Sequence, residues 1–270
     1  LHIASDDLGS KIGFAGIRFL FAGILVTILA IIQKRKFKVE QKSVVAWLLL
    51  FALVNTALHY LFSYVGLGYL PSSRSTILDS MNGFFAIILS CIIFEDDKFS
   101  KFKALGCILG FGGILLINIE PGQNFFQGIS FRGDGMILLN ALCGAFGGII
   151  TRIISKKMDM TVATSLSMTI GGAFLCVVSA IIGPAARWTI TTESIIIMIG
   201  LILISAVCFG VYNQLLAYHP ISKIAIFNAF IPILGVIFSS IILGEPMRVK
   251  YIIAGCMVAL GVYVMNHFSK

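Results

Sequence analysis

Long apolar segments, separated by short polar joints, run along almost the whole chain. A helix needs about 20 apolar residues to cross the hydrocarbon core of a bilayer. Nine segments reach or approach this length, and in lipid a helix satisfies their backbone polar groups internally. They cover residues 12–32, 44–70, 73–94, 102–118, 134–155, 161–183, 193–218, 221–243 and 249–268. The pattern predicts an all-α membrane protein, a helical bundle in contact with the lipid bilayer.

The composition agrees with a lipid environment. Hydrophobic residues make up 58% of the 270 positions and charged residues only 12%, whereas a water-soluble domain carries roughly 25% charged residues. A net charge of +8 suggests a nucleic-acid ligand in a soluble protein, but here the basic residues lie in short joints between spans. We therefore expect no nucleic-acid partner.

The basic residues also predict the orientation in the membrane. The joint 33–42 carries five Lys or Arg residues, and most others lie in joints on the same side. Cytoplasmic loops are enriched in Lys and Arg. This joint and the C-terminus are therefore predicted to be cytoplasmic, in a multi-pass protein of the plasma membrane of the bacterial inner-membrane type.

Two stretches of the chain resemble each other. Each has a proline turn, an apolar segment, a glutamate and a Gly-Cys pair, and these are Pro71, Glu95, Gly106-Cys107 and Pro220, Glu245, Gly255-Cys256. The predicted orientation puts the two proline turns on opposite sides, so the repeats are expected to be inverted, as in many secondary transporters. We expect each glutamate to cap the helix that follows it.

The two repeats and the joint between them divide the chain into three parts. Residues 1–118 form a first repeat with four spans, 119–133 a linker, and 134–270 a second repeat with five spans. Because the first repeat has one span fewer than the second, we expect that a first helix is missing before Leu1 and that the intact protein has ten spans.

These motifs resemble the EamA-type branch of the drug/metabolite transporter superfamily. The resemblance covers nearly the whole chain and is carried by Arg18-Phe-Leu-Phe-Ala22, the two proline turns, Pro232, Gly133-Asp134, and Gly244-Glu245 followed by Gly255. It implies two five-helix inverted repeats and a secondary transporter, an exporter or exchanger of small metabolites such as amino acids or related polar solutes.

Polar side chains inside spans are costly and are therefore the first candidates for function. Asp79, with Asn82 close by, is a candidate proton-binding or solute-binding carboxylate; alternatively it pairs with Arg74 or is solvated at the outer mouth. Protons are the candidate coupling ion.

Three polar residues of the second span have the spacing of one helix face. Asn55, His59 and Ser63 follow each other at i, i+4 and i+8, and such a stripe is expected to face the bundle interior. His59 is a candidate proton acceptor near neutral pH, or a buried histidine bonded to a neighbouring helix.

Arg18 carries a permanent charge within the first span. It either holds an anionic group of a solute or anchors the bundle through helix carbonyls, and the family resemblance favours the structural role. Uncharged hydrogen-bonding groups in the second half suit zwitterionic or neutral polar solutes and also join helices. They are Asn140, Tyr212, Asn213, Gln214 and Asn228.

Other function classes find less support in the sequence. No phosphate-binding GxxxxGK[ST] loop and no HExxH motif occurs, and the four histidines are scattered; we expect no enzyme, no cofactor and no metal. A nucleotide-sugar or phosphate-ester antiporter of the same superfamily would require clustered Lys or Arg in its cavity. A non-transporting membrane scaffold is the other alternative.

Overall fold

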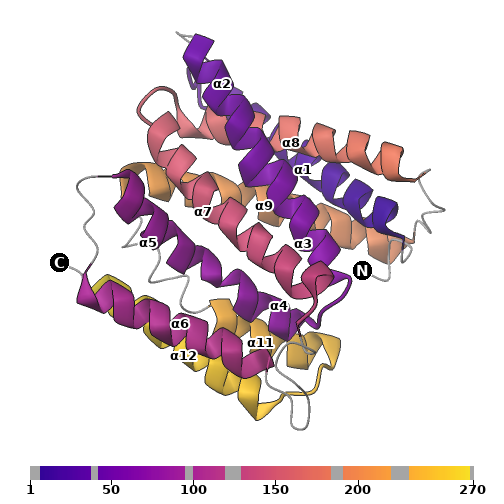
Figure 1. The fold of residues 1–270 in the computed structure, drawn as a ribbon. Helices are drawn as coiled ribbons and strands as arrows, with labels where there is room; N and C mark the ends of the chain where they lie inside the picture. Colours follow the sequence, from indigo (N-terminus) through magenta and orange to yellow (C-terminus); the bar gives the residue numbers. More distant parts are fainter. Residues whose placement is uncertain are drawn as a thin grey trace. The chain divides into compact units, whose positions relative to one another are not determined.

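The structure, a computed structural model, describes residues 7–37, 42–94, 100–118, 129–183, 191–219 and 231–267. Over these ranges the chain is helical and contains no strand (Figure 1). The helices are α1 (Leu8–Ile32), α2 (Lys42–Phe51), η1 (Ala52–Leu58), α3 (His59–Leu67), α4 (Ser72–Asp79), α5 (Met81–Ile93), α6 (Lys101–Asn118), η3 (Phe131–Gly135), α7 (Met136–Ile154), α8 (Met160–Ile182), α9 (Thr192–Tyr218), α11 (Ile231–Leu243) and α12 (Val249–His267).

The helices confirm an all-α, multi-pass membrane protein. Among the described residues, six helical runs are long and apolar enough to cross a bilayer; they are Leu8–Ile32, Ser43–Leu67, Ser72–Ile93, Phe131–Ile154, Met160–Ile182 and Thr192–Tyr218. Two shorter apolar helices lie at Ile231–Leu243 and Val249–Val264, and α6 covers the predicted span 102–118. The start of the predicted span 221–243 lies outside the described residues. The inverted relation of the repeats, their boundaries and a tenth helix stay predictions.

Three of the long runs are not uniform α-helices. The second contains a π-helical stretch, η1, between α2 and α3. The third is interrupted at Ser80, which lies between α4 and α5 and whose Oγ donates to the carbonyl of Thr76 at 2.7 Å. The fourth, Phe131–Ile154, begins with the short π-helical stretch η3. Such irregularities are frequent at functional sites in helices and at solute sites of secondary transporters.

The chain folds into two compact units, each of which combines both halves of the sequence. The first unit comprises residues 1–64 and 147–218, and the second comprises 65–146 and 219–270. The chain passes from one unit to the other within α3 and within α7. The units are therefore assembled from segments that are distant in sequence.

In the first unit, α1 lies beside α8 (Figure 1). Glycines allow this close approach: a Cβ atom on Gly172 of α8 would lie only 2.9 Å from the carbonyl oxygen of Gly16, and one on Gly16 only 2.7 Å from the backbone nitrogen of Cys176. Small residues of this kind let helix backbones pack directly in membranes. Two apolar clusters flank the contact, one around Phe51 and Ile154, the other around Phe19 and Met168.

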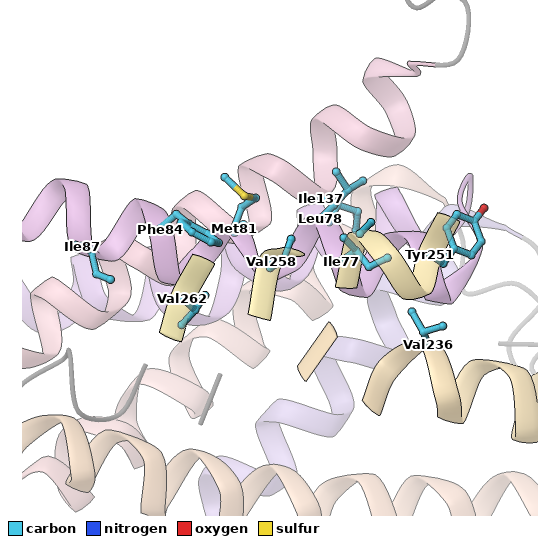
Figure 2. Packing of buried hydrophobic residues seen from close by; sticks show 12 residues of the cluster. Ile77, Leu78, Met81, Phe84, Ile87, Ile137, Val236, Tyr251, Val258 and Val262 are labelled. Atoms are coloured by element: carbon cyan, nitrogen blue, oxygen red, sulfur yellow. The ribbon is translucent and has the colours of Figure 1, made fainter. Parts of the chain in front are cut away.

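In the second unit, the buried core joins five helices. Figure 2 shows Leu78, Phe84, Ile137, Val236 and Val258 from α4, α5, α7, α11 and α12. The long helices α6 and α12 lie side by side. This core holds α4 and α7 together at the level where their polar side chains meet.

The surroundings of two glycines, one in the α1–α8 contact and one outside it, predict different effects of substitution by alanine. Gly172→Ala forces a methyl group against backbone atoms, so we expect the free energy of unfolding to fall by about 1–3 kcal/mol. Gly200 lies inside α9, and among the described residues no neighbouring group comes within 4 Å of the place that an alanine methyl would occupy there. Gly200→Ala should therefore leave stability unchanged or raise it by up to about 1 kcal/mol. Reversible unfolding in mixed micelles measures both; equal stabilities of the two variants would contradict the close backbone contact.

Candidate functional site

Arg18 lies near the middle of the membrane-spanning helix α1. It is ten residues after Leu8, the first residue of the helix, which corresponds to about 15 Å along the axis of a hydrocarbon core about 30 Å thick. A guanidinium does not lose its proton in proteins. At this depth a charged side chain costs about 2.5–3.5 kcal/mol on insertion scales, so the surroundings of Arg18 decide how the charge is tolerated.

Neutral groups surround the guanidinium of Arg18. Its Nε donates to Ser205 Oγ at 2.7 Å and its Nη1 to the hydroxyl of Tyr64 at 3.5 Å. The guanidinium carbon lies 5.0 Å from the ring centre of Phe19 and 5.9 Å from that of Tyr60, which is within range of a cation–π interaction. Within the described ranges Arg18 has no carboxylate partner. In this part of the chain its positive charge is therefore surrounded by neutral groups.

Aromatic rings from three helices pack beside Arg18. The ring of Phe19 lies 4.0 Å from that of Tyr60 and 5.8 Å from that of Phe209, and Tyr60 and Phe209 are 5.9 Å apart. His59, at the start of α3, contacts Tyr60 edge-on at 4.8 Å. Charges interact more strongly in such a low-dielectric setting than in water. Arg18, Phe19, Tyr60, Tyr64, Ser205 and Phe209 are called the arginine cluster below.

Two of the uncharged candidates in the first unit join helices. Asn213 donates to Thr164 Oγ1 at 3.0 Å and Gln214 to Thr161 Oγ1 at 2.7 Å, which links α9 to α8. Asn213 and Gln214, which the sequence suggested as solute ligands, therefore already use donors in bonds between helices.

The remaining candidates of the first unit lie on α3, η1 and α9. Asn55 of η1 faces α7, because a Cβ atom on Gly147 would lie 3.1 Å from its Cγ. His59 and Ser63 are half-buried, and Tyr212 is exposed on α9. The predicted stripe of Asn55, His59 and Ser63 therefore crosses the junction between η1 and α3.

In the second unit the structure brings together two sequence candidates. Asn140 of α7 is buried, and its Nδ2 donates to Asp79 Oδ1 at 2.5 Å. Asp79 is the last residue of α4, directly before the interruption at Ser80. One turn earlier, the buried Oγ of Ser75 has no hydrogen-bond partner among the described residues. Asn82 is half-buried on α5, and Asn228 lies outside the described residues.

The alternative pairing of Asp79 with Arg74 is wrong. Arg74 binds Asp134 instead, with Nη2 2.6 Å and Nε 2.8 Å from Oδ1, and the backbone amide of Ser130 donates to Oδ2 at 2.9 Å. Both side chains are largely buried. Sequence reasoning missed this ion pair because the two residues are 60 positions apart and no local pattern links them.

The expectation that Glu245 caps the helix that follows it is wrong. Glu245 caps the N-terminus of α4, not that of α12: its carboxylate accepts from the backbone amides of Ser72 (2.7 Å) and Ser73 (3.0 Å) and from Ser73 Oγ (2.8 Å). Pro71, the N-cap residue of α4, offers no side-chain acceptor. Gly244 has a φ of +66°, which favours glycine at the turn that brings Glu245 to α4. Glu95, the other predicted cap, lies outside the described residues.

The hydrogen bonds of Glu245 change its pKa. Partial burial raises the pKa of this carboxyl group, but the hydrogen bonds from Ser73 and Ser72 outweigh burial and hold the pKa below its ordinary value of 4.5. The ionised form is therefore the one that stabilises the fold.

Interrupted spanning helices with buried polar side chains are features of membrane transport proteins. A sequence profile of the EamA-like transporter family matches residues 3–119 and 131–267. The chain belongs to this family, which confirms the resemblance seen in the sequence.

One similar protein carries a transporter name, and another is a WAT1-related protein. The chain is 27% identical to the uncharacterized transporter YvbV of Bacillus subtilis, over 95% of this chain and 83% of that protein. It is 25% identical to the WAT1-related protein At3g02690, chloroplastic, of Arabidopsis thaliana, over 93% of this chain and 62% of that protein. A solved crystal structure with 11% identity superposes with a TM-score of 0.72, covering 96% of this chain and 88% of its own, and supports the fold alone.

The cap on α4 predicts a pH-dependent effect of Glu245→Gln. The substitution removes the charged acceptor, so we expect a loss of about 1 kcal/mol in the free energy of unfolding at neutral pH. Because the folded-state pKa is lowered, this stabilisation is fully present above about 4.5 and is lost as the pH falls through the folded-state pKa. Thermal unfolding from pH 7 to pH 3 should show the two proteins converging at acid pH.

Glu193→Gln is the matched control for this measurement. Glu193 is exposed in the first turn of α9, so its removal should cost less than that of Glu245. A difference between wild type and Glu245→Gln that stays constant over the whole pH range would contradict the charged cap.

Proposed function

We propose that this protein is a secondary carrier for small solutes that bear a carboxylate, such as amino acids and related polar metabolites, and that Arg18 binds the carboxylate. The observation that carries the proposal is the guanidinium at mid-span without a carboxylate partner in the described part of the chain. A solute carboxylate supplies the missing negative charge.

The hydrogen-bonding geometry of Arg18 supports this role. A guanidinium has five N–H donors in a planar fork that matches a carboxylate, and two of them are used by Ser205 and Tyr64. These two contacts fix the side chain from α9 and α3 while leaving donors for a ligand. The aromatic rings of Phe19, Tyr60 and Phe209 offer apolar surface to the rest of a solute.

The charge count favours singly charged or zwitterionic solutes over phosphate esters. Arg74, in the first turn of α4, adds no net positive charge, because Asp134 neutralises it. One guanidinium suits one carboxylate, whereas a nucleotide sugar or a phosphate ester carries more negative charge than Arg18 alone balances. The antiporter alternative is therefore less well supported.

Asp79 is the group that we propose for proton coupling. Its described partner is the neutral amide of Asn140 and not a cation, so no fixed positive charge holds it ionised. It ends α4 at the interruption of the third spanning run, where a change of charge acts on a break in the helix. Export or exchange across the plasma membrane is part of the proposal and rests on the family resemblance. A cytoplasmic C-terminus is also part of it and is supported by the lysine-rich joints.

Removing the charge of Arg18 should abolish transport of carboxylates selectively. For the intact protein in liposomes, we expect saturable flux of at least one labelled amino acid, and a 10- to 100-fold loss of kcat/KM in Arg18→Gln, the usual effect of losing a charged hydrogen bond. Arg132→Gln, which alters an exposed arginine, is the control and should transport normally.

Two results would contradict the proposal. Normal amino-acid flux in Arg18→Gln would show that Arg18 is only structural. The absence of flux of any amino acid or related metabolite in verified, folded wild type would favour phosphorylated solutes or a scaffold role.

Asp79→Asn should uncouple flux from the proton gradient. The asparagine keeps the shape of Asp79 but cannot exchange a proton, so we expect solute exchange to persist while its dependence on an imposed pH gradient disappears. His59→Gln serves as the comparison, because His59 is the other candidate proton acceptor. If Asp79→Asn retains the pH dependence and His59→Gln loses it, the coupling site is His59 and the assignment to Asp79 is wrong.

A further inference from the structure

A pocket in the first unit is separate from the arginine cluster. It has a volume of about 970 Å³ and is lined by three segments: the joint after α1, the joint between α7 and α8, and the end of α9. Four basic residues, Lys34, Arg35, Lys36 and Lys157, line it together with a single acidic one, Asp159. A pocket of this charge is suited to an anion.

The acidic residue does not neutralise the pocket, because its oxygens are already engaged. Asp159 Oδ1 accepts from the backbone amides of Thr161 (2.8 Å) and Val162 (3.4 Å) and so caps α8. Its Oδ2 pairs with Arg35 Nη1 at 3.2 Å.

The three lysines therefore carry the excess positive charge. In the ranges that the structure covers, Lys34, Lys36 and Lys157 form no ion pair. An anion in the pocket would meet all three.

The backbone at Lys34 shows that a lysine is held where glycine is favoured. The φ of Lys34 is +54°, the left-handed conformation that glycine adopts without steric cost. The amides of Lys34 and Arg35 donate to the carbonyls of Ile31 and Ala30, both at 2.9 Å, which is the pairing of a Schellman motif at a helix end. Lys34 therefore occupies the left-handed position after α1 that glycine usually takes.

Apolar surface adjoins the basic side chains. Met158, Met160 and Tyr218 also line the pocket. Tyr218 is 77% exposed, and Ile31 and Ile32 at the end of α1 are 62% and 70% exposed. Tyrosines and lysines beside exposed apolar helix surface are typical of the membrane–water interface. A ligand with an anionic head and apolar chains fits this neighbourhood better than a fully soluble anion.

We propose that this pocket binds the phosphodiester headgroup of an anionic phospholipid from the leaflet at this end of α1, with Lys34, Lys36 and Lys157 around the phosphate. Basic pockets at the ends of spanning helices bind such headgroups. The alternative is a solvated basic face that serves only to orient the protein, and that role requires neither a pocket nor a left-handed lysine. The predicted orientation assigns this end to the cytoplasmic leaflet.

Lipid binding by the full chain in detergent tests the proposal. Native mass spectrometry would count bound phosphatidylglycerol and bound phosphatidylcholine of the same chain length for wild type, Lys34→Gly, Lys157→Gln and Lys156→Gln. We expect wild type to prefer phosphatidylglycerol, and each of the two pocket variants to bind it about fivefold more weakly. Lys156 is exposed beside Lys157 but does not line the pocket, so Lys156→Gln should change affinity less than twofold.

Lys34→Gly also separates lost binding from misfolding. Because glycine suits the backbone of residue 34, the melting temperature of this variant in phosphatidylcholine should equal or exceed that of wild type, while its affinity for phosphatidylglycerol falls. Unchanged affinity in both pocket variants, or an equal loss in Lys156→Gln, would overturn the proposal. Binding of soluble glycerol phosphate as tightly as phosphatidylglycerol would overturn the lipid assignment, since the phosphate alone would then be the ligand.

Discussion

A guanidinium halfway along a lipid-spanning helix constrains the structure around it. Arg18 remains charged in the membrane, and its described neighbours are hydroxyl groups and aromatic rings, not a carboxylate. Hydrogen bonds to Ser205 of α9 and Tyr64 of α3 hold the half-buried side chain against these helices. Among the described residues the charge therefore has polar and aromatic neighbours but no counter-ion, which is the state expected of a binding site for a solute anion.

The other polar contacts of the spans form a contrast with Arg18. Arg74 has a carboxylate partner, Asn213 and Gln214 are bonded to threonines of α8, and Glu245 is fixed by the amides of α4. These contacts join helices within each unit, and in each of them a donor is paired with an acceptor. The Asp79–Asn140 pair shares a feature with each kind of site. It joins α4 and α7 like the other contacts, but its carboxylate faces a neutral donor and not a cation. The proposed functional groups, Arg18 and Asp79, are those that have no oppositely charged partner among the described residues.

Much of the fold follows from the sequence, because apolar length and composition report directly on the lipid environment. The long apolar runs could be read directly, and Arg18 and Asp79 were visible as costly charged positions in apolar helices. The interruption at Ser80 and the π-helical stretch η1 were not predicted, since neither has a glycine or proline to mark it. Pairings over long sequence distances, such as Arg74 with Asp134 and Glu245 with α4, depend on how helices pack and have no local signature. The one available hint was Pro71, which begins a helix without a side-chain cap of its own.

The most direct test of the central claim compares affinities for matched solutes. The equilibrium affinities of a transported amino acid and of its carboxamide would be measured for wild type and for Arg18→Gln in the same detergent. If the guanidinium binds the carboxylate, wild type should prefer the amino acid by at least tenfold, and the variant should bind the two almost equally. A preference of the same size in both proteins would show that another group recognises the carboxylate, and it would contradict the role of Arg18.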